Sequence, residues 1–303
     1  MNEMRIIYCA DPWNKRRPDP AYEAEVIAAT EVGLAYSVID FDVLVSEKTI
    51  VKAVRHVEPS PEPTLAIYRG WLLRPAVYQQ LYDLLVSKQL YLINTPDAYR
   101  HCHYLPESYA VIEGHTPLSV WMKTVADVSF DTIMELLKPF GTKPAIVKDF
   151  VKSRKHEWFE ACYIPSAADR QVVERVIKRF MELQGEDLNE GLVFREFVNF
   201  EQLTTHSKSG MPLTREFRLF FLDGKPVLFS EYWEEGIYGD VRPSIDFFNA
   251  IAQNVQSRFF TMDVAQRRDG GWMIIELGDG QVAGLPERAD VSVFYRSFAT
   301  LVQ

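Results

Sequence analysis

The chain has 303 residues, of which 47% are hydrophobic and 25% are charged, values typical of an ordinary globular protein. Its formal net charge of −9 argues against general nucleic-acid binding, because neutralising phosphates requires a basic surface. No apolar run approaches the ~18 residues of a membrane span, and the opening MNEMRIIYCAD lacks the long apolar region of a signal peptide. The three cysteines are far apart, as expected in a reducing compartment. We therefore expect a soluble cytoplasmic protein without nucleic-acid or membrane partners; nothing in the sequence indicates an oligomeric state.

The first third of the chain alternates predicted strands and helices. Strands are predicted at 5–10, 34–41, 65–71 and 90–94, with helices at 21–32 and 75–87. In the first helix, the spacing places Ala24, Ile27, Ala28 and Val32 on the buried side, and Gly33 follows its end. Strand, helix, strand is the unit of a parallel sheet covered by helices. No glycine-rich dinucleotide fingerprint follows the first strand, so a Rossmann cofactor site is not expected.

An irregular segment is predicted at 94–121. It contains His101, Cys102 and His103, but neighbouring residues cannot easily all reach one ion, so zinc is not favoured. Arg69, just after the third strand, and Arg100 could face a cleft and bind an anionic substrate. A surface or interdomain salt bridge is an equally good interpretation of each arginine.

A concentration of positive charge follows in the second unit of the chain. After a helix at 129–141, a strand at 143–151 places Ile146, Lys148 and Phe150 on one face. A lysine inside an apolar strand must reach water or meet an anion, because burying it unpaired is costly. Lys148 and the loop residues Lys152, Arg154, Lys155 and His156 give five basic side chains within nine residues, which predicts an anion site. A solvated basic loop is the alternative.

The rest of the chain is predicted to be an antiparallel sheet with helices. A helix at 166–183, with Ser166 as its N-cap, precedes a strand at 191–198. A hairpin at 214–233 turns at Asp223-Gly224, and its pairing puts Glu216 and Arg218 on the face shared with Val227 and Phe229. Helices are predicted at 245–256 and 290–303, which makes this half an α+β unit.

Between the last two helices, Asp269-Gly270 marks a second hairpin. With these residues as the turn, in a four-residue loop at 268–271, Asp263 lies directly opposite Glu276, with β-carbons about 5 Å apart. The reverse face of this hairpin would form core, through Met262, Val264, Met273, Ile275 and Leu277.

Two facing carboxylates repel unless they share a proton, have a basic neighbour or bind a cation. Oxygen ligands suit Mg²⁺ or Mn²⁺, and magnesium held by one or two carboxylates usually takes its other ligands from phosphates and water. Asp279, three residues after Glu276, is a possible further ligand. A solvated acidic face is the alternative interpretation.

The order of these features resembles the ATP-grasp enzymes, the superfamily of D-alanine–D-alanine ligase, glutathione synthetase and biotin carboxylase. The runs YRGW, INTPDAYRHCHYLPE, VKDFVKS, REFV, EFRLFFLDGKPV and IELGDGQVAGL are similar to those of a bacterial and phage branch of that superfamily. The resemblance covers essentially the whole chain. It implies an α/β pre-ATP-grasp domain at 1–115, followed by α+β ATP-grasp lobes at 116–303 with antiparallel sheets, helices and the nucleotide between them.

The resemblance also implies roles for individual residues. Lys148, and less directly Lys123, match lysines that bind nucleotide phosphates. Arg195, Glu196, Phe197 and Val198 match the segment whose backbone meets the adenine edge, with Glu196 on the ribose or adenine. Arg218 matches a basic residue directed at the transferring phosphate or the substrate carboxylate, and Asp263 and Glu276 match the two metal-ligand acids. Two departures stand out: Gly278 occupies the usual place of an asparagine ligand, for which Asp279 would substitute, and the loop at 151–158 has no glycine.

The implied activity is that of an ATP- and Mg²⁺-dependent (or Mn²⁺-dependent) ligase. It would activate a small-molecule or peptide carboxylate as an acylphosphate, which an amine then attacks to give an amide. Lys148, Lys152 and Arg218 would neutralise the phosphate oxygens during transfer, and Arg69, Arg100 and His101 would border the acceptor site. The alternatives are a small-molecule kinase, a nucleotide-binding module without catalysis, or a fold-only match with a different ligand.

Overall fold

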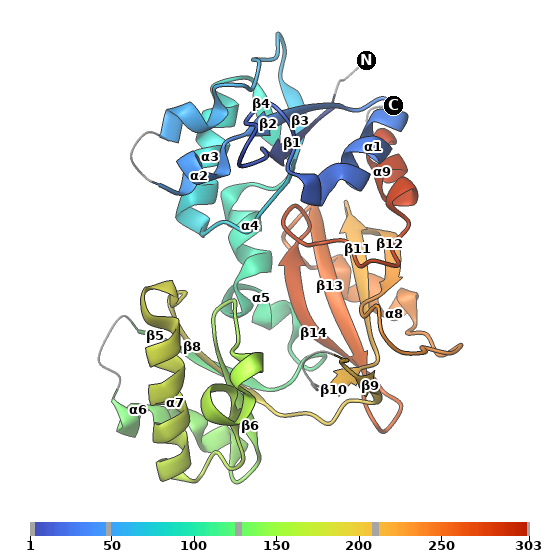
Figure 1. Ribbon diagram of the computed structural model, residues 1–303. Coiled ribbons are helices and arrows are strands. Elements are labelled where there is room, and N and C mark those ends of the chain that lie inside the picture. Colours follow the sequence, from blue (N-terminus) through green and yellow to red (C-terminus); the bar gives the residue numbers. More distant parts are fainter. Residues whose placement is uncertain (1–3, 47–49, 125–128, 208–211, 302–303) are drawn as a thin grey trace.

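A computed structural model of the protein describes residues 4–46, 50–124, 129–207 and 212–301. Its first domain is built on a parallel sheet of order β2-β1-β3-β4 (Figure 1). The strands are β1 (Met4–Cys9), β2 (Ala35–Ile39), β3 (Thr64–Arg69) and β4 (Leu90–Leu92), and the helices between them are α1 (Glu23–Glu31), α2 (Phe41–Val45) and α3 (Pro75–Val86). The alternation predicted from the sequence is confirmed here, apart from α2.

Helix α1 buries a different face from the predicted one. Glu25, Ala28 and Ala29 are buried, whereas Ile27 is 55% exposed. Glu25 turns inward because it binds the buried guanidinium of Arg69. Gly33, with a φ of 78°, follows the end of the helix as predicted.

Two helices occupy much of the segment that was predicted to be irregular. They are α4 (Pro96–His103) and α5 (Leu105–Ile112). The Thr95 hydroxyl caps α4 by accepting a hydrogen bond from the amide of Ala98, and both helices carry a proline in their first turn, where no amide donor is required. These helices connect the first domain to the rest of the chain (Figure 1).

The second sheet is antiparallel and has the order β5-β8-β6-β7. Its strands are β5 (Ser119–Lys123), β6 (Ala145–Asp149), β7 (Tyr163–Ile164) and β8 (Gly191–Glu196), and its helices are α6 (Phe130–Leu137) and α7 (Arg170–Gln184). The α7 N-cap is Asp169 and not Ser166, because the helix begins four residues later than predicted. Short 3-10 turns lie at Pro20–Tyr22, Ile50–Val54, Lys138–Phe140, Lys155–Glu157 and Gly185–Asp187, and a π-helical turn at Trp158–Cys162.

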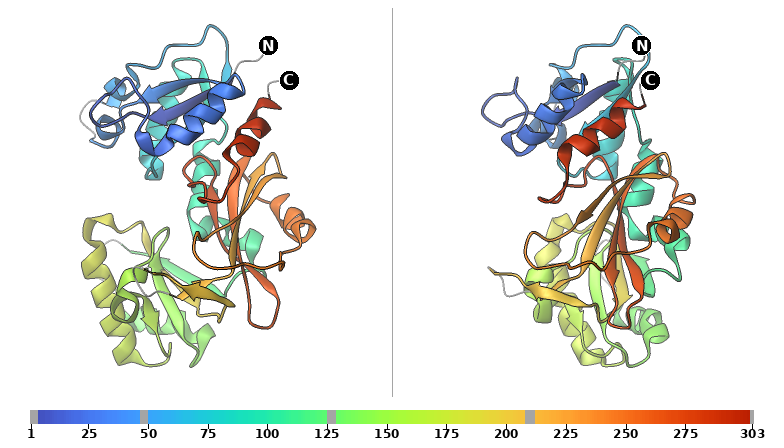
Figure 2. Two further views of the ribbon diagram at one scale, coloured as in Figure 1. Left: turned by 45° about the vertical axis from the view of Figure 1, so that its right-hand side comes forward. Right: turned by 90° about the vertical axis from the view of Figure 1, so that its right-hand side faces the viewer.

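The third sheet is antiparallel with the order β12-β11-β13-β14. Its strands are β11 (Glu216–Leu222), β12 (Lys225–Glu231), β13 (Phe259–Gln266) and β14 (Trp272–Asp279), with helix α8 (Ile245–Ala252) beside them and a small ribbon of β9 (Gln202–Thr205) and β10 (Pro212–Thr214). The last helix, α9 (Val291–Ala299), returns to the first domain and lies beside α1 (Figure 2). No helix in the described parts of the chain is long and apolar enough to span a membrane.

Two β-bulges set the registers of the third sheet. In β11–β12 the register shifts after Phe220, so Arg218 faces Ser230, and Phe229 lies on the opposite face against Phe217, contrary to prediction. In β13–β14 the loop has three residues rather than four, since Arg267 donates its amide hydrogen to the carbonyl of Gly271.

That shorter loop places Gln266 opposite Trp272 and Val264 opposite Ile274. A bulge at Ile275 then restores the predicted pairing, and Asp263 lies opposite Glu276. The core face of this hairpin consequently carries Ile274 in place of the predicted Ile275. The facing carboxylates are therefore confirmed, although by a route that differs from the predicted one.

Candidate active site between the sheets

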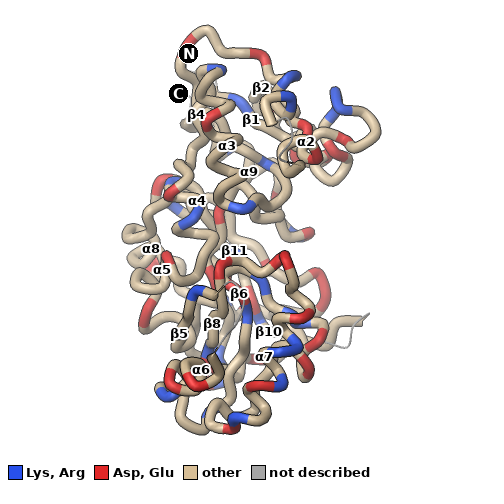
Figure 3. Tube along the Cα trace, turned by 90° about the vertical axis from the view of Figure 1, so that its left-hand side faces the viewer, with Lys and Arg blue, Asp and Glu red and all other residues tan. Residues whose placement is uncertain are grey.

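A cavity of about 280 Å³ lies where the second sheet, the third sheet and the first domain meet. Charged side chains enter it from β6, β11 and β14, and apolar side chains enter from the first domain and from the loop after β14. In Figure 3, basic and acidic segments lie next to each other around β6. The charged lining residues are Lys148, Lys152, Arg218, Glu276 and Asp279.

Arg218 and Asp263 form the most closely bonded ion pair of the site. They are opposite each other on β11 and β13, and the guanidinium donates to both carboxylate oxygens, at 2.8 and 2.7 Å. Burial lowers the pKa of Arg218, but the attraction of Asp263 raises it further, so the guanidinium stays charged. Arg218 also donates to the carbonyl of Gly284 at 2.9 Å, which ties the pair to the loop after β14.

Lys148 meets Glu276 across the boundary between the two sheets. The lysine is 6% exposed, and its Nζ lies 3.5 Å from a Glu276 oxygen. Burial raises the pKa of Glu276, but Lys148, Lys155 and Arg218 lower it further, so the net pKa is below its ordinary value. The prediction that a buried lysine in this strand meets an anion is confirmed.

Asp263 and Glu276 have the chemistry of a divalent-cation site with few protein ligands. Both supply carboxylate oxygens on one face of the sheet, as Mg²⁺ prefers. No group of three or more His, Cys, Asp or Glu side chains within the described residues could hold a metal ion. The acid pair thus fits an ion that takes its remaining ligands from phosphate and water, with one Asp263 oxygen exchanged from Arg218.

Asp279 is not brought into this pair. It lies on the opposite face of β14 from Glu276, and its carboxylate accepts hydrogen bonds from the side chain of Asn94 at 2.6 Å and from the amide of Gln281 at 2.9 Å. Burial raises the pKa of Asp279 to about 6. A β-carbon at Gly278 would lie 2.7 Å from the Thr261 hydroxyl, so the site has no room there for an asparagine without a shift of Thr261.

The predicted phosphate-side lysines differ in their surroundings. Lys152 borders the cavity with an exposed side chain, and its backbone amide donates to Asp149 at 2.5 Å. Asp149 itself is held by Gln184 and Asn189, which fixes the start of the basic loop. Lys123 is 72% exposed and lies 3.6 Å from Glu190, outside the cavity lining.

The segment 195–198 lies at the end of β8, beside an aromatic cluster. Phe197 packs against Trp158 and Tyr163, with ring centroids 5.9 and 5.1 Å apart. Glu196 accepts a 2.7 Å hydrogen bond from Lys143. The Phe197 amide is already bonded to the carbonyl of Pro144 at 3.0 Å, so the backbone on either side of it, including Val198, is left to meet a ligand.

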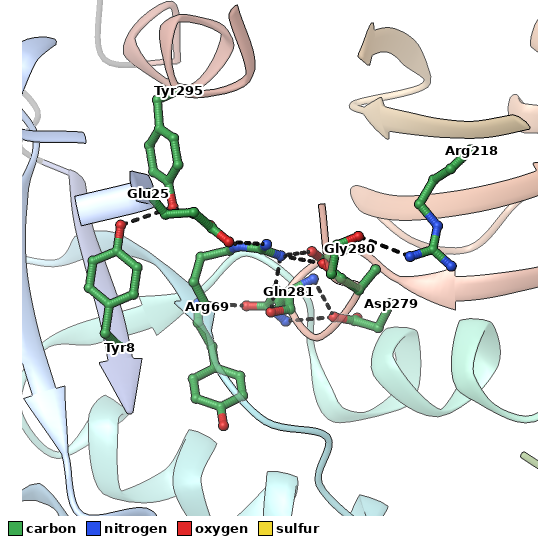
Figure 4. A network of polar contacts seen from close by, with 11 residues as sticks. Tyr8, Glu25, Arg69, Arg218, Asp279, Gly280, Gln281 and Tyr295 are labelled. Atoms are coloured by element: carbon green, nitrogen blue, oxygen red, sulfur yellow. Dashed lines mark hydrogen bonds and ion pairs between the residues drawn. The ribbon is translucent and has the colours of Figure 1, made fainter. Parts of the chain in front are cut away.

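Arg69 is buried in a network that joins the first domain to the loop after β14 (Figure 4). Its guanidinium holds both oxygens of Glu25, at 2.8 and 2.9 Å. It also donates to the carbonyls of Gly280, Gln281 and Ala283. Tyr295 of α9 donates to Glu25 at 2.6 Å. Arg69 therefore has its hydrogen bonds filled by protein and is not available to a substrate.

Arg100 likewise makes an interdomain ion pair. It donates to both oxygens of Glu190, at 2.7 and 2.8 Å, and to Glu107 at 3.0 Å. His101 is 8% exposed and does not line the cavity. The structure thus favours the salt-bridge interpretation for both arginines and does not bring His101 to the site.

Sequence reasoning missed several cavity residues. His103 borders the cavity with an Nε2 atom that has no hydrogen-bond partner among the described residues. Thr261 could have been found, because it lies two residues before Asp263 on the same strand face. The apolar lining had no local signal and consists of Leu72, Leu105, Phe150, Val151, Leu277, Val282 and Ala283.

The comparisons with known proteins agree with this architecture. A family model described as an ATP-grasp domain, from family 3 of one clade of that superfamily, matches residues 139–298, more than half of the chain. The protein therefore belongs to the ATP-grasp family. No curated protein matches the sequence.

Solved structures show the same fold over the whole chain at low sequence identity. The ATP-grasp ligase PsnB, complexed with minimal precursor, Mg and ADP, has 11% identity and a TM-score of 0.60, with 100% of this chain and 98% of that chain covered. D-cycloserine synthetase DcsG has 13% identity and a TM-score of 0.58, with 99% of each chain covered. D-alanine–D-alanine ligase from Bacillus anthracis, complexed with ATP, has 13% identity and a TM-score of 0.57, with 100% and 97% covered.

Proposed function

We propose that the protein is an ATP- and Mg²⁺-dependent carboxylate–amine ligase that releases ADP, with Mn²⁺ able to replace Mg²⁺. The observation that carries the proposal is the meeting of two ion pairs, Arg218–Asp263 and Lys148–Glu276, at one cavity between the sheets. Cations for phosphate oxygens and carboxylates for a divalent ion are thereby assembled from strands of two sheets. The ligase activity of structurally similar proteins such as PsnB supports the same conclusion.

In this proposal the nucleotide lies between the lobes of an ATP-grasp domain at 116–303, and the pre-ATP-grasp domain at 1–115 closes the acceptor side. The segment Arg195–Val198 meets the adenine edge through its backbone, with Glu196 on the ribose or adenine. Lys148 and Lys152 bind the phosphates, and the exposed Lys123 makes a peripheral contact at most. Asp263 and Glu276 hold the divalent cation, with no ligand from Asp279.

The chemistry is mainly positioning and electrostatic stabilisation. Lys148 and Lys152 neutralise charge on the γ-phosphoryl group, and Arg218 holds the substrate carboxylate or the transferring phosphate in line. A bound magnesium ion would neutralise the phosphate oxygens further. The resulting acylphosphate loses phosphate when an amine attacks its carbonyl carbon, and the attacking nitrogen gives up a proton as the amide forms.

The acceptor is proposed to be a small-molecule or peptide carboxylate with an apolar portion. The wall formed by Leu72, Leu105 and Val282 is apolar, whereas the opposite wall carries Arg218 and Lys148. An apolar group beside a carboxylate matches these two walls. The PsnB structure with a precursor peptide supports a peptide as one form of acceptor.

The thermal midpoint with ATP and Mg²⁺, added separately and together, tests the proposal. We expect the combined shift to exceed the sum of the separate shifts, and Asp263→Asn to lose that excess. Incubation with pooled carboxylates and amines should then release ADP and phosphate only when both are present. ADP release with a phosphorylated product and no amine would instead identify a kinase. A combined shift equal to that of ATP alone would contradict the proposal.

A further inference from the structure

Three hydrogen bonds from outside the third sheet converge on two residues of its edge strand, β14. The amide of Ile274 donates to the carbonyl of His115 at 2.7 Å, and the Thr116 hydroxyl donates to the carbonyl of Ile274 at 2.8 Å. The guanidinium of Arg195, on β8 of the second sheet, donates to the carbonyl of Ile275 at 2.7 Å. The edge strand is thus held at this point by two separate segments of the chain.

Ile275 is the bulged residue that sets the direction of Glu276. With the three-residue loop alone, Asp263 would face Ile275, and Glu276 would point to the core side of the sheet. The extra residue shifts the strand by one, so that Glu276 faces Asp263. Whatever stabilises the bulge therefore also fixes the orientation of Glu276.

Arg195 is an unusual residue to find at this position. It is 5% exposed, and its other hydrogen bonds run to the hydroxyls of Thr116 at 2.8 Å and Ser119 at 3.3 Å, with no carboxylate among its described bonding partners. Burial lowers its pKa to about 10. Removing a guanidinium from water without an anionic partner is costly, and an apolar side chain of similar volume would fill the space at lower cost. The contacts that Arg195 makes therefore point to a role beyond packing.

We infer that Arg195 is a positioning residue that, together with Thr116, holds the β-bulge at Ile275 and thereby directs Glu276 toward Asp263 and the divalent cation between them. The inference rests on the proposed function, because it assigns a role toward the proposed metal site. Arg195 immediately precedes Glu196, so one side chain links the nucleotide segment of β8 to the metal-side acid of β14. A disturbance on either side is transmitted to the other through this contact.

Metal binding is the direct test. Free Mn²⁺ is measured by electron paramagnetic resonance during titration of the full-length protein with a saturating non-hydrolysable ATP analogue present. Arg195→Gln and Arg195→Lys should weaken Mn²⁺ binding about 10- to 100-fold, the usual effect of removing a group that orients a metal ligand. Arg170→Gln, which removes an exposed arginine of the same lobe, is the matched control and should bind Mn²⁺ like the wild type.

A double-mutant cycle separates positioning from general damage. If Arg195 acts through Glu276, adding Arg195→Gln to Glu276→Gln should weaken Mn²⁺ binding no further. Full additivity of the two losses would overturn the inference.

Thr116 provides a second route if the Arg195 variants do not fold. Thr116→Val should weaken Mn²⁺ binding about tenfold or more, whereas Thr116→Ser keeps the hydroxyl and should not. Unchanged Mn²⁺ binding in the folded Arg195 or Thr116→Val variants would overturn the inference but leave the proposed function intact. A wild-type protein that binds no Mn²⁺ with the analogue would overturn the proposed function and the inference with it.

Discussion

Arg218 holds both carboxylate oxygens of Asp263, so the acid proposed as a metal ligand is already fully bonded to a guanidinium before any ligand arrives. A divalent cation that binds Asp263 must take over one of these oxygens. The guanidinium is then freed to meet a phosphate or a carboxylate. The same pair would therefore act as a counter-ion in one state and as two separate functional groups in the other.

Replacing Arg218 should change the metal requirement as well as the stability. In Arg218→Met, Asp263 remains buried and unpaired, which should cost roughly 3–5 kcal/mol of unfolding free energy. Mg²⁺ without ATP should then raise the thermal midpoint of this variant more than that of the wild type, because the ion replaces the lost positive charge. Arg258→Met breaks an exposed bidentate pair with Asp223 in the same sheet and should cost about 1 kcal/mol or less. Equal effects of Mg²⁺ on wild type and Arg218→Met would contradict this prediction.

The three candidate acids should separate in a metal titration. Glu276→Gln and Asp263→Asn each remove a proposed ligand, and we expect Mg²⁺ to lose its effect on the ATP-induced rise in thermal midpoint. Asp279→Asn should keep that effect, because Asp279 is bonded to Asn94 and Gln281 on the other face of β14. Loss of the Mg²⁺ effect in Asp279→Asn, with the other two variants unaffected, would place the cation on the wrong acid in our account.

Arg69 is expected to matter for stability and not for substrate affinity. Arg69→Met leaves Glu25 buried without its guanidinium, at a cost of roughly 3–5 kcal/mol, measured as a lower urea midpoint. Adding Glu25→Gln should recover part of the loss, since the stranded charge is then removed. Arg74→Met, at an exposed position, serves as the control. A stable Arg69→Met with a raised KM for the acceptor would show instead that the arginine binds substrate.

Acid should destabilise the protein through His103. Burial lowers the pKa of His103 to about 4, whereas the unfolded chain titrates near pH 6.5, so stability is lost as the pH falls through this window. The contribution at pH 4 is roughly 3 kcal/mol. The urea midpoint of His103→Gln should therefore fall less between pH 7 and 4 than that of the wild type. His56→Gln, outside the site, should follow the wild type; parallel pH profiles for all three proteins would rule out this role of His103.

The parts of the site that follow from regular spacing could be predicted from the sequence. The facing of Asp263 and Glu276 was predicted correctly because two unforeseen features cancel: a loop shorter by one residue and a bulge at Ile275. Neither bulge has a local sequence signature. An anion for Lys148 follows from burial cost alone, but its identity as Glu276 depends on how two sheets meet.

The arginines show where single-sequence reasoning reaches its limit. Arg69 and Arg100 were predicted to border a substrate, yet their partners Glu25 and Glu190 lie 44 and 90 residues away in the chain. Only tertiary packing reveals such pairs. The helices α4 and α5 were missed for a different reason, since Pro96 and Pro106 were taken as signs of a loop although proline is well tolerated in the first turn of a helix.

The return of α9 to the first domain has a consequence for biosynthesis. Met4, Ile6 and Ala28 share one core with Phe294, Tyr295 and Phe298. During translation the earliest strands therefore emerge from the ribosome long before the helix that covers them. Until residues near 298 are released, that apolar surface stays exposed, and the nascent chain would depend on chaperones to avoid aggregation.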